Sequence, residues 1–383
     1  QAPSVAGTNT LDLPASSGTL LTTTGNGSQL TGLPNSYAGT KNLIINGNMQ
    51  IAQRATSVAG ITSTGGGYFT VDRFAYTLSS GGGTWTQSQD ADAPEGFAKS
   101  LKLSCTATGT YGATTNWNAL YQSIEGFNLQ QLKYGTANAE SLTVSFWVKS
   151  NQTGTYSILY YGGDSGRSIA SEYTILSANT WEKKTITIAG DTSGIINNDN
   201  GSALSLYFTL AAGSLRWSNA LQTSWGAYDI NGSVPSSQVQ LGGSISDYLQ
   251  ITGVQLEVGD TATDFENLQY TTQLQLCQRY CYVLGGETSY QWLSTGPSQA
   301  TNYMTGFVFP PVTMRAGPTL SYGTLSHYRA WHSNSWGVAA SIGLNQSGAS
   351  SIGVDVQKTG LTGTCALGMN NSTASKLIFS AEL

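Results

Sequence analysis

The sequence predicts an all-β protein, and three of its features support this prediction. Among its 383 residues there are 46 glycines, and only 10% of the residues are charged, against about 25% in a typical globular domain. Apolar residues alternate with serine and threonine in many short runs, which is the pattern of half-buried strands. Asn-Gly pairs separate several of these runs and favour turns with positive φ, including tight hairpins.

The composition also excludes several classes of protein. A formal net charge of −5 without any cluster of lysine or arginine argues against nucleic-acid binding through phosphate contacts. No apolar run approaches the roughly 18 residues that a membrane-spanning helix needs, so no membrane insertion is expected. The many aromatic residues and the low net charge are atypical of disorder. What remains is a polar, uncharged surface of the kind common in extracellular β-rich proteins.

Residues 1–40 are predicted to form a stem or attachment segment, the end of a longer fibre, because they cannot bury a core alone. They are rich in Thr, Gly and Ser, and their apolar residues occur as short pairs such as Leu20 and Leu21. A disordered linker is the alternative. Because the sequence begins at Gln1 without an initiator Met, we expect an upstream part of the chain.

Residues 41–266 are predicted to form a two-sheet sandwich, most closely a jelly roll, because short strands recur at regular spacing. Leu142, Val144, Phe146 and Val148 alternate with polar residues, apart from Trp147, which should therefore face outward or into a subunit contact. In the last strand the apolar parity changes at Gly253. Such a change predicts a β-bulge that returns the following apolar residues to the core.

A short helical connector is predicted over 267–286. Tyr270, Leu274, Cys277, Cys281 and Leu284 follow spacings of 4 and 3 residues, a short heptad seam that two glycines end. The same spacing would strain a disulfide between the two cysteines. We therefore expect all four cysteines to be free thiols, which is typical of assembly in a reducing cytoplasm.

Residues 287–383 are predicted to form a second, C-terminal β-domain that makes the distal tip. Strand-like runs lie at 337–342, 352–356 and 376–379. Aromatic and imidazole side chains gather between the strands without clean alternation, which indicates a loop-like group exposed to a ligand. The members of this group are Tyr322, His327, Tyr328, Trp331, His332 and Trp336.

Several stretches resemble a domain common in bacteriophage tail-fibre and other virion proteins. Asn42–Arg54 (NLIINGNMQIAQR) and Tyr68–Phe74 (YFTVDRF) resemble its opening, and Phe146–Ser150 (FWVKS) its central strand. Val254–Gly259, followed by Ala262–Glu266, resemble the closing strand of this domain. Cys277–Tyr280 and Pro311–Thr319 resemble the segments that usually follow that strand. The motifs occur in the expected order, and Gly25–Leu33 resembles a stem repeat of phage fibres.

This resemblance implies a virion appendage, assembled in the host cytoplasm, that is an elongated homotrimer with a sandwich like that of carbohydrate-binding modules. The expected function is non-enzymatic attachment to a host-surface glycan, with other virion proteins bound through the stem. Two alternatives remain: a structural capsid fibre or decoration protein without an essential ligand, and a glycan-depolymerising tail spike. The resemblance leaves open whether the fibre sits on the tail or the capsid, and which domain binds the receptor.

The residues that could carry catalysis are few, so we expect no enzyme. Glycoside hydrolysis needs two carboxylates, one with a raised pKa, and no acid lies in a catalytic spacing motif. Asp72 and Arg73 are better explained as an ion pair that locks the first strand. His327 and His332 have no third ligand near them in sequence. The acids considered were Asp72, Glu125, Asp164, Glu172 and Asp191.

Sugar binding needs fewer specialised residues than catalysis does, because flat aromatic faces can stack on pyranose rings while polar side chains fix their orientation. In the C-terminal domain the group from Tyr322 to Trp336 is the predicted ligand-binding site. In the sandwich, Trp85, Trp117, Tyr160, Tyr161, Trp217 and Trp225 are candidates, each of which could instead pack in the core or at a subunit contact. No cofactor is required, but a structural calcium ion held by Asp260, Asp264 and Glu266 is kept open.

Overall fold

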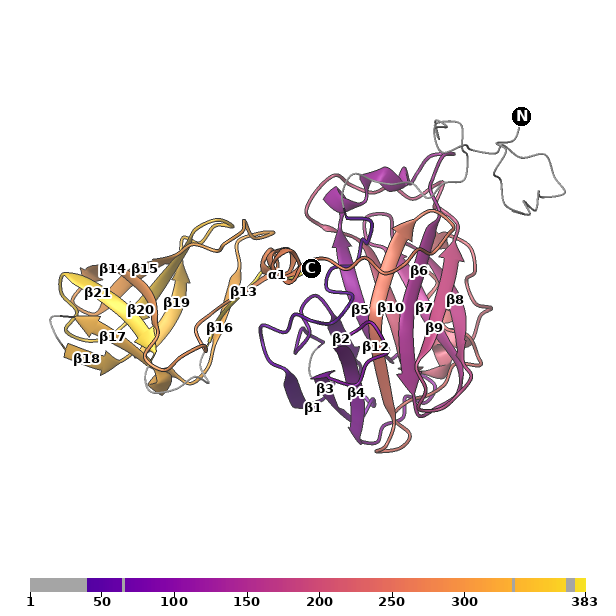
Figure 1. Cartoon of the computed structure of the whole chain (residues 1–383), viewed down its shortest axis with the longest axis horizontal. Helices are drawn as coiled ribbons and strands as arrows, with labels where there is room; N and C mark the ends of the chain where they lie inside the picture. Colours follow the sequence, from indigo (N-terminus) through magenta and orange to yellow (C-terminus); the bar gives the residue numbers. More distant parts are fainter. Residues whose placement is uncertain (1–39, 64–65, 333–334, 370–375) are drawn as a thin grey trace, which may run out of the picture. The chain divides into compact units, whose positions relative to one another are not determined.

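The computed structural model describes residues 40–63, 66–332, 335–369 and 376–383 (Figure 1). The predicted stem over 1–40 lies outside these ranges except for its last residue. The predicted fold class is confirmed: nearly all of the regular structure is antiparallel β-sheet, in a two-sheet sandwich followed by a second β-region with its own core. Short 3₁₀ turns occupy Gly126–Asn128, Gln130–Leu132, Ser214–Trp217, Ile230–Gly232 and Leu325–His327.

The sandwich consists of two six-stranded sheets. The first runs in the order β1 (Ser57–Ile61), β3 (Thr84–Asp90), β4 (Ser100–Ala107), β12 (Tyr248–Val258), β6 (Leu142–Ser150) and β9 (Glu182–Ile188). The second runs β11 (Gly226–Ala227), β8 (Arg167–Ile175), β7 (Gly154–Gly162), β10 (Ser202–Ala212), β5 (Trp117–Glu125) and β2 (Ala75–Leu78). The chain crosses repeatedly between the sheets, as expected for a jelly roll.

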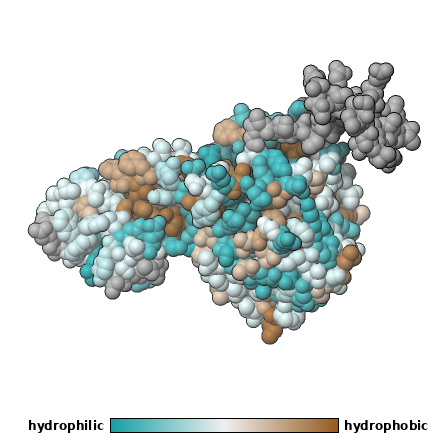
Figure 2. All heavy atoms as spheres, in the orientation of Figure 1, coloured by the Kyte–Doolittle hydropathy of each residue, from teal (hydrophilic) through white to brown (hydrophobic). Residues whose placement is uncertain are grey.

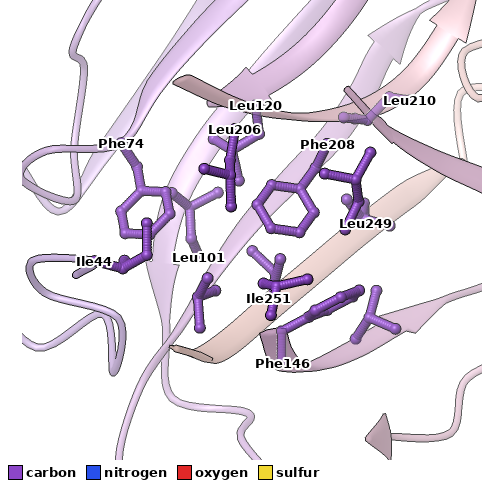
Figure 3. Close-up of a cluster of buried hydrophobic side chains, with 14 of the residues drawn as sticks. Ile44, Phe74, Leu101, Leu120, Phe146, Leu206, Phe208, Leu210, Leu249 and Ile251 are labelled. Atoms are coloured by element: carbon purple, nitrogen blue, oxygen red, sulfur yellow. The ribbon is translucent and has the colours of Figure 1, made fainter. Parts of the chain in front are cut away.

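The core between the two sheets is built from the alternating positions that the sequence predicts. Phe146 on β6 meets Phe208 on β10 edge to face, with ring centroids 5.2 Å apart (Figure 3). Both rings are buried, as are Leu206 and Ile251 beside them. Trp147, at the opposite parity, is half-buried and points out of this core. Alternation in the sequence therefore correctly assigned the inward-facing side of these strands.

The β-bulge predicted at Gly253 is confirmed. The register between β12 and β6 shifts between Thr252 and Gln255, and Gly253 has a φ of +61°. A Cβ atom at this position would also come within 2.7 Å of the Phe97 ring. The bulge lets Ile251 and Val254 both face the core although they are three residues apart, and only glycine fits there without strain.

We expect Gly253→Ala to lower the free energy of unfolding by about 2 kcal/mol, because a side chain there meets both the left-handed backbone penalty and the Phe97 ring. The measurement is the urea midpoint of the purified variant. Gly343→Ala is the matched control: it lies in a strand, its Cβ would have no neighbour within 4 Å, and it should change stability by less than about 0.5 kcal/mol. Equal stability of the two variants would contradict this reading of Gly253.

The helical connector is shorter than predicted. The helix α1 spans only Tyr270–Gln278, and Cys281–Leu284 form strand β13, which pairs with β22 (Leu377–Ser380). The predicted seam therefore breaks after Cys277, and Tyr270 is 59% exposed. The physical reason is the long-range pairing with β22, which stacks Tyr282 on Phe379. Correspondingly, the two glycines that follow end a strand rather than a helix.

The second β-region contains two sheets. A three-stranded sheet runs β13, β22 and β16 (Thr319–Tyr322). A seven-stranded sheet runs β18 (Ser335–Val338), β17 (Tyr328–His332), β21 (Thr364–Met369), β14 (Trp292–Ala300), β15 (Tyr303–Val308), β20 (Ile352–Gln357) and β19 (Ser341–Asn345). A separate core, with Tyr328, Leu367 and Phe379 among its members, holds these sheets together.

All four cysteines are buried free thiols, as predicted. On the face drawn in Figure 2 the surface is mostly of hydrophilic or intermediate hydropathy, in keeping with the low charge and the many Ser, Thr and Asn residues. No helix within the described residues has the length and hydrophobicity needed to span a bilayer.

The predicted ion pair between Asp72 and Arg73 does not form. Arg73 has a φ of +72°, so the two neighbours lie in a turn and their side chains reach different partners. Asp72 accepts hydrogen bonds from Gln53 and lies 3.6 Å from the Arg54 guanidinium. Arg73 instead pairs with Glu382, which Arg54 also contacts at 3.0 Å. These four charged side chains, all nearly buried, join the opening motifs to the C-terminal strand segment.

Burial raises the pKa of Asp72 to about 6, although Arg54 and the hydrogen bonds from Gln53 act in the opposite direction. Because the folded pKa lies above the ordinary value of 3.8, the folded state binds more protons, and the contribution of Asp72 to stability falls as the pH rises from about 4 to about 6. We expect the unfolding free energy of the wild type minus that of Asp72→Asn to fall across this window. A difference that rises with pH would mean that Arg54 outweighs burial.

Candidate functional site

The six residues predicted as a ligand-binding group differ in their exposure, and one of them is buried. Tyr328 is 0% exposed and belongs to the core, where its hydroxyl donates to the Lys376 carbonyl at 2.9 Å, so it cannot contact a ligand. Tyr322 is partly exposed on β16, edge-on to Tyr328. The imidazole Nε2 of His332 lies 2.8 Å from the Lys358 ammonium, and His327 ends a 3₁₀ turn.

Trp331 and Trp336 are brought together, but on strands rather than in a loop as the sequence suggested. They form a direct cross-strand pair between β17 and β18, with ring centroids 6.5 Å apart. Tyr328 and Ala330 take the inward positions of β17, so Trp331 takes an outward position on the same strand. Buried and partly exposed residues alternate from Tyr328 to Trp331 in the structure, but the sequence Tyr-Arg-Ala-Trp-His does not show this alternation clearly, so Tyr328 was included in the predicted group.

A third indole, Trp292, completes the group and was missed. It lies on β14, with its ring centroid 5.0 Å from that of Trp336 and 6.3 Å from that of Trp331. The plane of its indole is tilted by 34° from that of Trp336 and by 90° from that of Trp331. Trp292 and Trp336 are 54% and 44% exposed. We refer to Trp292, Trp331 and Trp336 as the indole cluster.

The floor beneath the indole cluster is made by small residues of β21, the strand between β14 and β17. Ala366 pairs with Trp331, and Gly368 pairs with Trp292. Ala366 is buried although Cys365 and Leu367 take the core-facing positions, which indicates that it is covered from outside by the rings. A Cβ atom at Gly368 would touch the Trp336 ring at 3.4 Å. Because these two residues are small, the three large rings can pack against one face of the sheet.

The residues kept open as a calcium site do not assemble. Both carboxylate oxygens of Glu266 accept backbone N–H groups, from Lys41 at 3.1 Å and from Asn42 at 3.0 Å. Within the described ranges no group of three or more His, Cys, Asp or Glu side chains is arranged to hold a metal ion, so Asp260, Asp264 and Glu266 do not form such a group. Glu266 instead fixes the entry of the chain into the sandwich.

The aromatic candidates in the sandwich divide into core and surface residues. Trp85 and Tyr160 are buried in the core. Trp117, half-buried, packs on Tyr207 and lies under the Arg216 guanidinium. Tyr161 contacts Tyr228, and Trp217 and Trp225 each line a concave surface.

No protein-family model and no curated protein matches the sequence. Among solved structures, the enzymatically active domain of tailspike protein 4 of bacteriophage CBA120 is similar over 57% of this chain, with 14% identity and a TM-score of 0.31. That match spans 21% of the tailspike chain. A putative sugar binding protein from Bacteroides thetaiotaomicron is similar over 57% of this chain and 99% of its own, with 11% identity and a TM-score of 0.31. The CBM22-1–CBM22-2 tandem domain of Paenibacillus barcinonensis Xyn10C is similar over 80% of this chain and 92% of its own, with 12% identity and a TM-score of 0.27.

Proposed function

We propose that this chain binds carbohydrate without cleaving it, and that the indole cluster is its main contact surface. The observation that carries the proposal is the gathering of Trp292, Trp331 and Trp336 from three strands onto one solvent-facing part of a sheet. Indole rings combine a large apolar face with a polar N–H, which suits the apolar faces and the hydroxyl groups of a pyranose. The rigid strands below hold the rings in place before the ligand arrives, which limits the entropy lost on binding.

The size of the indole cluster favours a sugar over a protein partner. A buried aromatic side chain covers about 150–250 Å², so three partly exposed indoles offer on the order of 300 Å². A stable protein interface needs about 800 Å² on each partner. Arg329 takes the outward position next to Trp331 on β17 and pairs with Val338, so a charged side chain lies at this border of the apolar surface. A short stretch of glycan fits these dimensions.

Three of the five acids named as catalytic candidates support a non-enzymatic function. Asp72 has the raised pKa that a general acid needs, but it is fully buried among charged partners. Glu125 is buried and accepts two hydrogen bonds from Arg279, at 2.8 and 2.7 Å. Burial alone would raise the pKa of Asp191, yet the hydrogen bonds from Arg167 and two backbone N–H groups lower it. Neither an accessible proton donor nor a carboxylate pair arises from these three residues.

The biological setting that we propose is a virion fibre, on the tail or the capsid, which attaches to a host-surface glycan. This part of the proposal rests on the resemblance of the motifs in 41–320 to phage fibre proteins. As a homotrimer, the fibre would present three indole clusters, and several weak sites acting together give firm adhesion. A structural decoration protein would need no such cluster.

The proposal is tested by applying the purified chain to an array of neutral and acidic oligosaccharides and to host cells. We expect binding to a defined set of glycans, without release of reducing ends during prolonged incubation. Failure to bind any glycan or cell at high protein concentration would favour a decoration protein. Release of reducing ends would show an enzyme, and electron microscopy of labelled virions would locate the protein on tail or capsid.

A further inference from the structure

A cleft of about 710 Å³ lies at the edge of the sandwich, and none of its lining residues belongs to the indole cluster. The strands β8 and β9, one from each sheet, pack side by side there (Figure 1). Its walls come from three segments: part of β8 over 167–172, the end of β9 with its following turn over 187–193, and the loop over 221–225. Its volume falls within the range of about 300–1,000 Å³ that is typical of small-molecule sites.

One wall of the cleft is held in place by the ion pair between Arg167 and Asp191. Arg167 Nε donates to Asp191 Oδ2 at 2.7 Å, and Asp191 also accepts the backbone N–H of Ser193 at 3.0 Å. The Asp191 side chain is almost fully buried, whereas Arg167 is partly exposed. A Cβ atom at Gly194 would lie 2.3 Å from Asp191 Oδ2, so the glycine makes room for this carboxylate. The ion pair thus cancels the one cation that lines the cleft and fixes its wall.

One indole, Trp225, is anchored at the rim of the cleft by three contacts. Its Nε1–H donates to the Ala189 carbonyl at 2.8 Å, and its own carbonyl accepts a hydrogen bond from Arg167 at 3.1 Å. The Tyr134 ring meets the indole edge to face at 5.7 Å. The loop that carries it is tied to β8, because the Ala170 N–H donates to the Gln222 carbonyl at 2.8 Å. The ring is half-buried and held in one orientation.

Several polar groups around Trp225 have no protein partner within the described residues. They are the hydroxyls of Thr192, Thr223 and Ser224 and the carboxylate of Glu172, all on exposed residues. A fixed aromatic ring beside unused hydroxyls and one acceptor-only carboxylate matches the alternating apolar faces and hydroxyl groups of a sugar. The carboxylate would repel an acidic sugar, since Arg167, the cation among the described lining residues, is already paired.

We infer that this cleft is a second carbohydrate site, which takes a neutral oligosaccharide and uses Trp225 as its stacking platform. The site goes beyond the function proposed above because it shares no residue with the indole cluster. Glu172 and the free hydroxyls bind sugar hydroxyls, and the Arg167–Asp191 pair keeps the wall in place. Two unlike sites on one chain allow a single subunit to engage two parts of a branched or long glycan.

The test uses the full chain carrying Trp331→Ala and Trp336→Ala, in which the indole cluster is disabled, on an array of neutral and acidic oligosaccharides. We expect this variant to retain binding to neutral members of the array, and adding Trp225→Ala to weaken that binding at least tenfold. If the first variant binds nothing that the wild type binds, or if its binding survives Trp225→Ala, the second site is disproved. The indole cluster is tested separately, by the glycans that the wild type binds and that the variant with Trp331→Ala and Trp336→Ala loses.

Because Trp225→Ala could loosen the loop, a surface variant provides an independent test. The Glu172 carboxylate has no partner among the residues that the structure describes, so Glu172→Lys should leave the unfolding midpoint unchanged while reversing the charge at the cleft. We expect acidic oligosaccharides, such as those that contain uronic or sialic acids, to bind this variant at least tenfold more tightly than they bind the wild type. An unchanged preference between neutral and acidic oligosaccharides would overturn the role given to Glu172.

Discussion

Replacement of Glu382 by glutamine is expected to lower the free energy of unfolding by about 3–5 kcal/mol, the range for breaking a buried ion pair from one side. Glu382 is almost buried and contacts both Arg54 and Arg73. Arg73 is 1% exposed and lies 3.5 Å from the centre of the Tyr280 ring, so it cannot reach water when the carboxylate is neutralised. Its remaining hydrogen bond, to the Ser123 carbonyl at 2.6 Å, does not supply a negative charge.

The measurement is urea unfolding of the Glu382→Gln variant beside Glu95→Gln, which replaces an exposed acid whose carboxylate has no hydrogen bond or ion pair within the described part of the chain. The control should lie within about 0.5 kcal/mol of the wild type. Adding Arg73→Met to Glu382→Gln should recover part of the loss, because the unpaired charge is then removed as well. If Glu382→Gln is as stable as the control, these side chains do not form a coupled network.

This network shows which parts of the fold the sequence could not reveal. The opening motifs stood out, but their partner Glu382 lies near the other end of the sequence, and no local pattern connects them. For the same reason the seam over 270–284 predicted a longer helix: the residues that draw Cys281–Leu284 into a strand are those of β22. Patterns of period two within single strands were reliable, because burial on one face needs only neighbouring residues. The bulge at Gly253 belongs to this local class.

The same distinction between local patterns and contacts across long sequence distances applies to the candidate site. Trp331 and Trp336 were found because they are close in sequence, whereas Trp292 joins them only across β21, through pairings that sequence proximity does not indicate. The small residues Ala366 and Gly368, which make the floor of the cluster, carried no chemical signal of their own. Grouping aromatic residues by sequence also included Tyr328, which the structure places in the core. Nearness in sequence likewise did not bring Asp260, Asp264 and Glu266 into one group of carboxylates within the described residues.

Replacement of both Trp331 and Trp336 by alanine is expected to abolish glycan binding and host adsorption at the indole cluster. Truncation of a tryptophan at the centre of a binding surface commonly costs about 2 kcal/mol or more, which is roughly thirtyfold in affinity for each ring. The two losses together would lower the affinity of a weak site below the detection limit. When several sites engage at once, the affinity lost at each site adds to the total loss of adhesion. Trp292→Ala should also weaken binding. This result would distinguish a binding surface of three indoles from one made of Trp331 and Trp336 alone.

Phe307→Ala is the matched control, because Phe307 is a large aromatic side chain, 51% exposed on β15 of the same sheet, and is not part of the cluster. It should leave binding unchanged, and all variants should keep the unfolding midpoint and the oligomeric state of the wild type. Gly368→Val tests the floor, since its side chain would displace the Trp336 ring while every indole remains in the sequence. Undiminished adsorption by the double variant would show that the receptor does not contact the cluster. Sensitivity to Phe307→Ala would instead indicate a general apolar interaction.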